Sequence, residues 1–170
     1  KAGDIHDAVI ASSEQQAKSL WKLREGIVEG QRLEGASIKH DVSVPVSKVP
    51  EFIETAWATV AKRVPGIRPC PFGHVGDGNI HFNLSQPPDM GAEAFLSLWE
   101  EVNDLVHDHV AGLGGSFSAE HGIGMSKVDE MQRYKDPTGL KIMAAIKQAL
   151  DPDDLFNPGK VIPPPDADAR

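Results

Sequence analysis

Two histidines, His74 and His81, flank a stretch of sequence that favours a tight turn, and imidazoles placed in this way are candidate metal ligands. The dipeptide Asp77-Gly78 between them is typical of a two-residue hairpin turn, in which both central residues take a positive φ. That turn would pair residue 74 with residue 81 and hold their Cβ atoms roughly 5 Å apart on one face. Histidine pairs in hairpins are also common surface residues, so this pair alone does not establish a metal site.

A second group of reactive side chains lies in the segment Glu120-His121-Gly122-Ile123-Gly124, which supplies a carboxylate and a third imidazole. Its glycines allow the backbone to approach a ligand closely. Two histidines and one glutamate around an open coordination position form a common catalytic metal site. We therefore expect His74, His81 and Glu120 to meet in space as metal ligands.

The composition is that of one globular domain. The chain has 170 residues, of which 40% are hydrophobic and 25% are charged. Its formal net charge of −8 argues against nonspecific binding to nucleic acid. No segment approaches the roughly 20 apolar residues of a membrane span. The single cysteine, Cys70, fits a reducing compartment, so a cytoplasmic location is expected, with peripheral membrane association left open.

The spacing of apolar residues predicts helices mixed with hairpin-paired strands, which is an α+β fold with a sheet covered on one face. In the segment 79–84, Ile80, Phe82 and Leu84 share one face while His81 and Asn83 share the other. One face of this strand is therefore expected to be core and the other a polar site. Strands are expected over 4–10, 37–46, 68–75 and 79–84, and helices over 13–29, 47–63, 93–111, 137–150 and, as a single turn, 153–156.

The first and last long helices each carry apolar residues at helical spacing, which predicts a buried stripe on the first helix. These residues are Ala17, Leu20, Trp21 and Ile27 in the first helix and Leu140, Met143, Ile146 and Leu150 in the last.

Five motifs in a fixed order resemble the C-terminal part of flavin-linked 2-hydroxy-acid oxidoreductases of the vanillyl-alcohol-oxidase type. That family includes D-lactate dehydrogenase, D-2-hydroxyglutarate dehydrogenase and the glycolate oxidase catalytic subunit. The resemblance extends over about residues 8–162. The motifs are Trp21-Lys22-Leu23-Arg24-Glu25, the segments 39–45 and 74–83, Glu120-His121-Gly122-Ile123-Gly124, and Phe156-Asn157-Pro158-Gly159-Lys160.

The resemblance implies that residues 1–162 form a substrate-binding cap domain with a ferredoxin-like antiparallel sheet and flanking helices. It also implies FAD held mainly by a separate N-terminal domain. No glycine-rich FAD-domain pattern is found here, so we expect the sequence to be a C-terminal fragment that does not turn over substrate alone. The Pro- and Asp-rich tail at 163–170 is expected to be disordered.

The same resemblance assigns roles to individual residues. It implies that His74, His81 and Glu120 hold a divalent metal, zinc or manganese, and that His121 is the catalytic base. An imidazole suits that task because its unperturbed pKa lies near neutrality.

Further roles implied by the resemblance concern the substrate and the flavin. Arg24 and Lys39 would hold substrate carboxylates, with Asn83 as a further polar contact. The planar guanidinium of an arginine can grip a carboxylate at two points. Asn157 and Lys160 match the segment that returns to the flavin.

The function expected from these assignments is oxidation of a D-2-hydroxy acid, of the lactate, glycolate or 2-hydroxyglutarate type, by hydride transfer to FAD. The expected partners are this substrate, the N-terminal FAD-binding domain and an electron acceptor, with a homodimer left open. Two alternatives remain from the residues themselves: a metal-dependent hydrolase using the same ligands, and a non-catalytic binding or subunit-interaction module.

Overall fold

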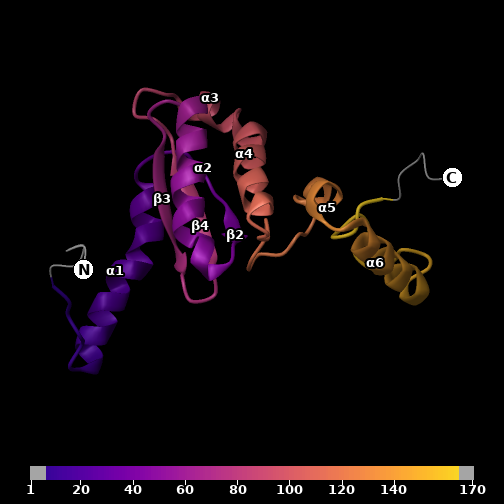
Figure 1. Cartoon of the computed structure of the whole chain (residues 1–170), viewed down its shortest axis with the longest axis horizontal. Coiled ribbons are helices and arrows are strands. Elements are labelled where there is room, and N and C mark those ends of the chain that lie inside the picture. Colours follow the sequence, from indigo (N-terminus) through magenta and orange to yellow (C-terminus); the bar gives the residue numbers. More distant parts are fainter. Residues whose placement is uncertain (1–6, 165–170) are drawn as a thin grey trace.

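An antiparallel sheet with helices packed on one face forms the centre of the molecule (Figure 1). The computed structural model describes residues 7–164. The strands are β1 (Ser37–Ile38), β2 (Asp41–Ser43), β3 (Arg68–His74) and β4 (Asn79–Ser85). The helices are α1 (Glu14–Arg32), the 3-10 turn η1 (Val46–Lys48), α2 (Val49–Arg63), α3 (Ala92–Leu96), α4 (Trp99–Gly112), α5 (Val128–Tyr134) and α6 (Pro137–Leu150).

The connectivity of the sheet is ferredoxin-like. Strand β4 is central, with β3 on one side and the consecutive strands β1 and β2 on the other, all antiparallel. Ser43 of β2 forms an isolated bridge with Ser116, which adds the next segment at that edge. Along the chain the order is strand, α2, two strands, α4 and the Ser116 segment, the βαββαβ pattern of this fold. The expected α+β, ferredoxin-like class is confirmed.

The core lies between this sheet and the helices α2 and α4, as the alternation of residues in the strands predicts. Ile80, Phe82 and Leu84 of β4 are at most 2% exposed. The side chains that face them come from β1, β2, α2 and α4: Ile38, Val42, Phe52, Ala56, Val60, Val102, Val106 and Val110. The opposite face of β4 carries Asn79, His81, Asn83 and Ser85 and is left for polar residues.

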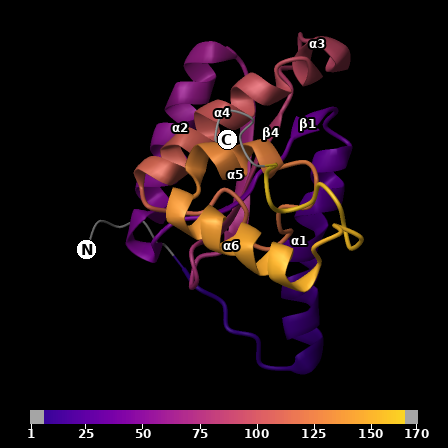
Figure 2. The same ribbon diagram turned by 90° about the vertical axis from the view of Figure 1, so that its right-hand side faces the viewer.

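Helices α1 and α6 leave their apolar stripes largely uncovered, so the prediction that the stripe of α1 is buried is wrong. The only buried residue of α1 is Gln31, and α6 has none. Trp21 is 64% exposed and Ile146 is 55% exposed. In Figure 1, α1 extends past one end of the sheet, and α5 and α6 lie beyond α4. Figure 2 shows α5 and α6 together on that side. Ala17, Ile27, Leu140 and Met143 are half-buried, so the two stripes are covered only in part within residues 7–164.

Three smaller expectations also differ. Residues 7–10 form no strand, and residues 4–6 lie outside the described part. The expected helix at 93–111 is divided into α3 and α4. Residues 153–156 form turns instead of a helix, because the carboxylate of Asp151 accepts the backbone N–H groups of Leu155 and Phe156.

Most of the predicted disordered tail, 165–170, lies outside the described residues. Within residues 7–164, every helix is too short or too polar to cross a lipid bilayer.

The hairpin between β3 and β4 has a four-residue turn, so the predicted two-residue turn is wrong. His74 pairs with Asn79, and Phe72 pairs with His81. The register is therefore shifted by two residues from the expected one. Because side chains alternate with a period of two, a shift of two keeps His74 and His81 on the same face. The two histidines are diagonal neighbours instead of direct partners.

The turn conformation explains this register. Gly78 has φ +78, but Asp77 is not among the residues with positive φ, so a type I′ turn, which needs both, is not formed. The carbonyl of Gly78 accepts the N–H of Val44 at 3.1 Å, which ties the turn to the residue after β2. A Cβ atom at Gly78 would lie 2.0 Å from the Val44 carbonyl oxygen, so this contact requires glycine.

Candidate functional site

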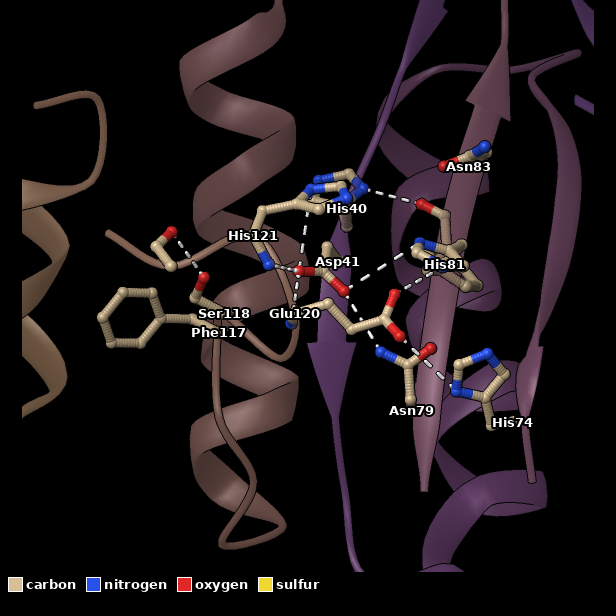
Figure 3. Close-up of polar contacts among 12 residues, drawn as sticks. His40, Asp41, His74, Asn79, His81, Asn83, Phe117, Ser118, Glu120 and His121 are labelled. Carbon is tan, nitrogen blue, oxygen red and sulfur yellow. Dashed lines mark hydrogen bonds and ion pairs between the residues drawn. The ribbon is translucent and has the colours of Figure 1, made fainter. Parts of the chain in front are cut away.

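The polar face of the sheet carries a cluster of imidazoles and carboxylates that comes from four segments (Figure 3). His81 and Asn79 belong to β4, His74 ends β3, and Asp41 begins β2. Glu120 comes from the loop that follows Ser116 and turns back over the strands. The strands alternate apolar and polar residues, and this alternation directs the polar side chains to the face opposite the core.

Glu120 lies between the two histidines. Its Oε2 is 3.3 Å from Nε2 of His81, and its Oε1 is 3.5 Å from Nδ1 of His74. A second grouping overlaps the first, since Asp41, His81 and Glu120 each offer a ligand atom within 4.8 Å of the others. The structure thus brings together the three predicted ligands around one carboxylate and adds Asp41. Two imidazole nitrogens and carboxylate oxygens are a donor set that suits zinc or manganese.

Asp41 is the buried acid of this cluster, with only 4% of the residue exposed. Its Oδ2 accepts the backbone N–H groups of Glu120 and His121, each at 2.8 Å, and its Oδ1 accepts Nδ2 of Asn79 at 3.1 Å. Burial raises the pKa of this carboxyl, but the hydrogen bonds from His121 and Glu120 outweigh burial and leave the pKa below its ordinary value. Asp41 is therefore ionised at neutral pH.

The loop that carries Glu120 is also held from its other side. Nζ of Lys127 donates to the carbonyl of Phe117 at 3.2 Å and to Oγ of Ser118 at 3.1 Å. Oγ of Ser118 in turn donates to the carbonyl of Gly122 at 2.7 Å. Burial lowers the pKa of Lys127, and the negative charge of Asp41 partly restores it. The loop is thus anchored on both sides of its reactive residues.

His121, the predicted base, lies at the mouth of the cluster. Its side chain is 69% exposed, and its Nδ1 is 3.6 Å from Oδ2 of Asp41. Its ring centroid is 5.9 Å from that of His81. A carboxylate beside Nδ1 favours the tautomer in which Nε2 is the proton acceptor. The arrangement can therefore take a proton from a group bound next to His81.

The predicted substrate contact Arg24 lies near the site, and the Phe72 ring contacts both its guanidinium and His81. Its Cζ lies 4.8 Å from the centroid of the Phe72 ring, and that ring lies 5.1 Å from the His81 ring. Arg24 is half-buried on α1. Its guanidinium is the positive group that α1 brings toward a cluster otherwise rich in acids, and it is suited to bind a carboxylate.

Asn83 and Lys39 occupy different environments on the same polar face. Asn83 is 4% exposed, and its Nδ2 donates to Oε1 of Gln31 at 2.8 Å. Nε2 of Gln31 donates to Oγ of Ser85 at 3.2 Å, so α1 fixes the orientation of Asn83. Lys39 is exposed in the short interruption between β1 and β2.

Asn157 and Lys160, the predicted flavin contacts, lie in one turn after α6. Nζ of Lys160 donates to Oδ1 of Asn157 at 3.1 Å, and Asn157 has φ +51. The N–H of Val161 donates to the carbonyl of Gly124 at 2.8 Å. This turn is therefore beside the loop of Glu120 and His121, and its two polar side chains engage each other.

Sequence reasoning gave no role to Asp41, Gln31, Lys127 or Phe72. A signal existed for Asp41, because strand alternation places it with Lys39 and Ser43 on the polar face next to an apolar face. No comparable signal marks Gln31 or Lys127, whose roles depend on contacts with residues distant in sequence or in a loop. The predicted two-residue turn would pair residue 72 with residue 83, so the contact between Phe72 and His81 was not expected.

Comparison with known proteins identifies the family of this chain. Residues 1–161 match the family described as FAD linked oxidases, C-terminal domain. This chain belongs to that family.

Three relatives of the chain are D-2-hydroxyglutarate dehydrogenases. It is 40% identical over 159 residues to the D-2-hydroxyglutarate dehydrogenase of Stutzerimonas stutzeri, covering 94% of this chain and 34% of that protein. It is 37% identical over 165 residues to the enzyme of that name from Xanthomonas citri, covering 97% of this chain and 35% of the relative. The mitochondrial Arabidopsis thaliana enzyme is 37% identical over 163 residues, with 95% and 27% coverage. The chain thus spans about a third of the length of these bacterial relatives.

Proposed function

We propose that this chain is the metal- and substrate-binding part of an FAD-dependent enzyme that oxidises D-2-hydroxyglutarate, or a D-2-hydroxy acid of similar shape, to the 2-oxo acid. The observation that carries the proposal is the position of Glu120, whose two oxygens lie 3.3 Å and 3.5 Å from ring nitrogens of His81 and His74. The names of the relatives support the choice of substrate over lactate or glycolate.

His74, His81 and Glu120 would hold the divalent cation, because their donor atoms converge without a cationic side chain among them. A cation bound there would polarise the substrate hydroxyl and lower its pKa. FAD, held mainly by another part of the protein, would supply the acceptor for hydride. The residues of this chain then orient the hydroxyl and remove its proton.

His121 is the group that takes the proton. Its Nδ1 is nearest the carboxylate of Asp41, at 3.6 Å, so Nε2 faces the hydroxyl in this proposal. The positive charge that develops on the ring is stabilised by that carboxylate. The exposure of His121 allows the proton to pass on to solvent after each turnover.

Arg24 binds a substrate carboxylate from the α1 side, where the Phe72 ring supports its guanidinium. Lys39 adds positive charge on the other side of β4, in the interruption between β1 and β2. A dicarboxylate with its two acids at opposite ends fits two separated cations better than a monocarboxylate does. Asn83, fixed by Gln31, contributes a polar group between them.

The first test is titration of the purified chain with Mn²⁺ by calorimetry. His81→Ala is expected to weaken binding more than about tenfold, since even outer partners of metal ligands contribute that much. His109→Ala is the matched control, because His109 lies on α4 and bonds Thr59 instead of the cluster. Equal Mn²⁺ affinity in wild type and His81→Ala would reject the site.

The second test concerns the reaction. This chain replaces the matching C-terminal third of the Stutzerimonas stutzeri relative, and flavin reduction is followed with D-2-hydroxyglutarate, its L-enantiomer and D-lactate. We expect reduction with D-2-hydroxyglutarate that is lost in His121→Asn. Ester or amide hydrolysis by the chain without flavin would favour a hydrolase instead.

A further inference from the structure

Asp41 lies close enough to His81 and Glu120 to bind the same cation. Its oxygens, however, already accept hydrogen bonds from the protein. A carboxylate oxygen offers about two lone-pair positions. Both positions of Oδ2 are filled by the N–H groups of Glu120 and His121. Oδ1 accepts Nδ2 of Asn79. A cation at Asp41 would therefore find only the second position of Oδ1 open, on a side chain that is almost fully buried.

The two ring nitrogens of His81 face two different carboxylates. Nε2 is 3.3 Å from Glu120, whereas Nδ1 is 3.9 Å from Oδ1 of Asp41. A histidine that binds a metal through one nitrogen commonly directs its other N–H at a carboxylate, which fixes the ring. Asp41 therefore lies on the side of His81 that points away from the proposed cation.

Asp41 also connects the two segments that make the site. Its backbone carbonyl accepts the N–H of Ala119 at 3.1 Å, and its side chain accepts the next two N–H groups of the same loop. Three successive N–H groups of the loop are thus held by one residue of β2. They hold the Glu120 segment directly against β2, beyond the bridge between Ser43 and Ser116.

We propose that Asp41 is a positioning residue, which fixes the Glu120–His121 loop against the sheet, and that it is not a ligand of the cation. The proposal rests on the metal site proposed above, but the attachment of the loop exists without metal and is measurable on its own.

Asp41→Asn separates the two roles. Its amide oxygen can replace Oδ2 and accept both N–H groups. Its NH₂ group then needs an acceptor where Oδ1 was. Oδ1 of Asn79 is buried and has no hydrogen-bond partner in the described part of the chain, so rotation of the Asn79 amide supplies that acceptor. Asp41→Asn therefore keeps the hydrogen bonds and removes the charge, whereas Asp41→Ala removes both.

Asp151 provides a matched control. It is 8% exposed, and its carboxylate accepts two backbone N–H groups, of Leu155 and Phe156, as Asp41 does for the site loop. It holds the turns after α6, outside the metal cluster. Asp151→Asn therefore changes the same kind of loop attachment at another place.

The experiment measures amide hydrogen exchange of Glu120 and His121 without metal, and Mn²⁺ affinity by calorimetry, in all variants. Asp41→Ala is expected to exchange at least about tenfold faster, as loss of hydrogen bonds to a charged group implies. Its Mn²⁺ affinity should fall about 10- to 100-fold, as for an outer partner of a ligand. Asp41→Asn should stay within about fivefold of wild type in both measurements. Asp151→Asn should leave both unchanged.

Two results would overturn the proposal. If Asp41→Asn loses Mn²⁺ binding as fully as His81→Ala while its amides exchange normally, Asp41 is a ligand. If Asp41→Ala exchanges at the wild-type rate, Asp41 does not hold the loop. If the alanine variant does not fold, the Mn²⁺ affinity and the amide exchange of Asp41→Asn alone decide whether Asp41 is a ligand. Absence of Mn²⁺ binding in the wild type rejects the proposed function, and the exchange rates then still decide the attachment of the loop.

Discussion

Phe72 and His81 are direct partners in the β3–β4 pair, and their ring centroids lie 5.1 Å apart with 39° between the ring planes. Arg24 from α1 places its Cζ 4.8 Å from the same Phe72 ring. Phe72 thus contacts both a proposed metal ligand and a proposed substrate contact. It is the apolar surface that links α1 to the sheet near the site.

Replacing Phe72 by leucine tests this link. The variant removes the aromatic face under Arg24, so its affinity for D-2-hydroxyglutarate is expected to fall about two- to fivefold, the size of an exposed cation–π contact. Phe156→Leu is the control, since Phe156 is 72% exposed after α6. Ligand affinity is measured by thermal shift in the presence of Mn²⁺. An unchanged ligand affinity would show that Phe72 does not support Arg24.

Replacing Gly78 by alanine tests the turn that sets the hairpin register. The new Cβ would lie 2.0 Å from the carbonyl oxygen of Val44, and the residue has φ +78. We expect the free energy of unfolding to fall by at least about 2 kcal/mol. Gly76→Ala is the matched control in the same turn, because its Cβ meets nothing within 4 Å. Urea denaturation measures both, and equal stabilities of the two variants would contradict the prediction.

The stability of the chain should depend on two buried histidines. Burial lowers the pKa of His40 and of His107 to about 4, and their rings lie 5.7 Å apart. The unfolded chain takes up these protons below about pH 6.5, the folded chain only near about pH 4. Stability is therefore full above about pH 6.5 and falls as the pH drops, by up to about 1.4 kcal/mol per pH unit for each histidine.

This prediction is measured as the difference between wild type and His107→Gln. Carboxylates titrate in the same range, and subtracting the two denaturation series between pH 7 and pH 4.5 cancels their contribution. The variant should lose stability less steeply than wild type. Parallel pH profiles would mean that His107 does not resist protonation in the folded chain.

Phe82 tests the core beneath the site. Its side chain is fully buried, and its ring centroid is 5.3 Å from that of Phe52 on α2. Phe82→Ala is expected to lower the free energy of unfolding by about 3–5 kcal/mol, through lost burial and the cavity that remains. Phe156→Ala removes an exposed ring and should change it by less than about 1 kcal/mol. The comparison is again by urea denaturation.

Local sequence pattern was sufficient to predict the faces of the sheet. Alternation placed Ile80 and Phe82 in the core and His81 and Asn83 on the polar face, and the structure confirms both. It was not sufficient for the turn. The conformation of Gly78 depends on Val44, which is far away in sequence, and no local propensity encodes that contact.

The uncovered helices show a second limit. Amphipathic spacing in α1 predicted a buried face, but such spacing says that a face is apolar and not what covers it, and the stripe of α6 is exposed in the same way. At the site, sequence reasoning named His74, His81 and Glu120, which the structure brings together, but it assigned no role to Asp41. The role of a strand acid can be read only when the groups that donate hydrogen bonds to it, here Asn79 and the loop of Glu120, are placed around it.

Strand β4 directs Ile80 and Phe82 into the core and His81 to the polar face, along one continuous backbone. A change in the packing of the lower side chains shifts that backbone, and the imidazole moves with it. Residues that never meet solvent or ligand are thus positions from which the geometry of the proposed site can be altered. A library varied only at 80, 82 and 84 would shift that geometry while the identity of every side chain in the proposed site stays the same.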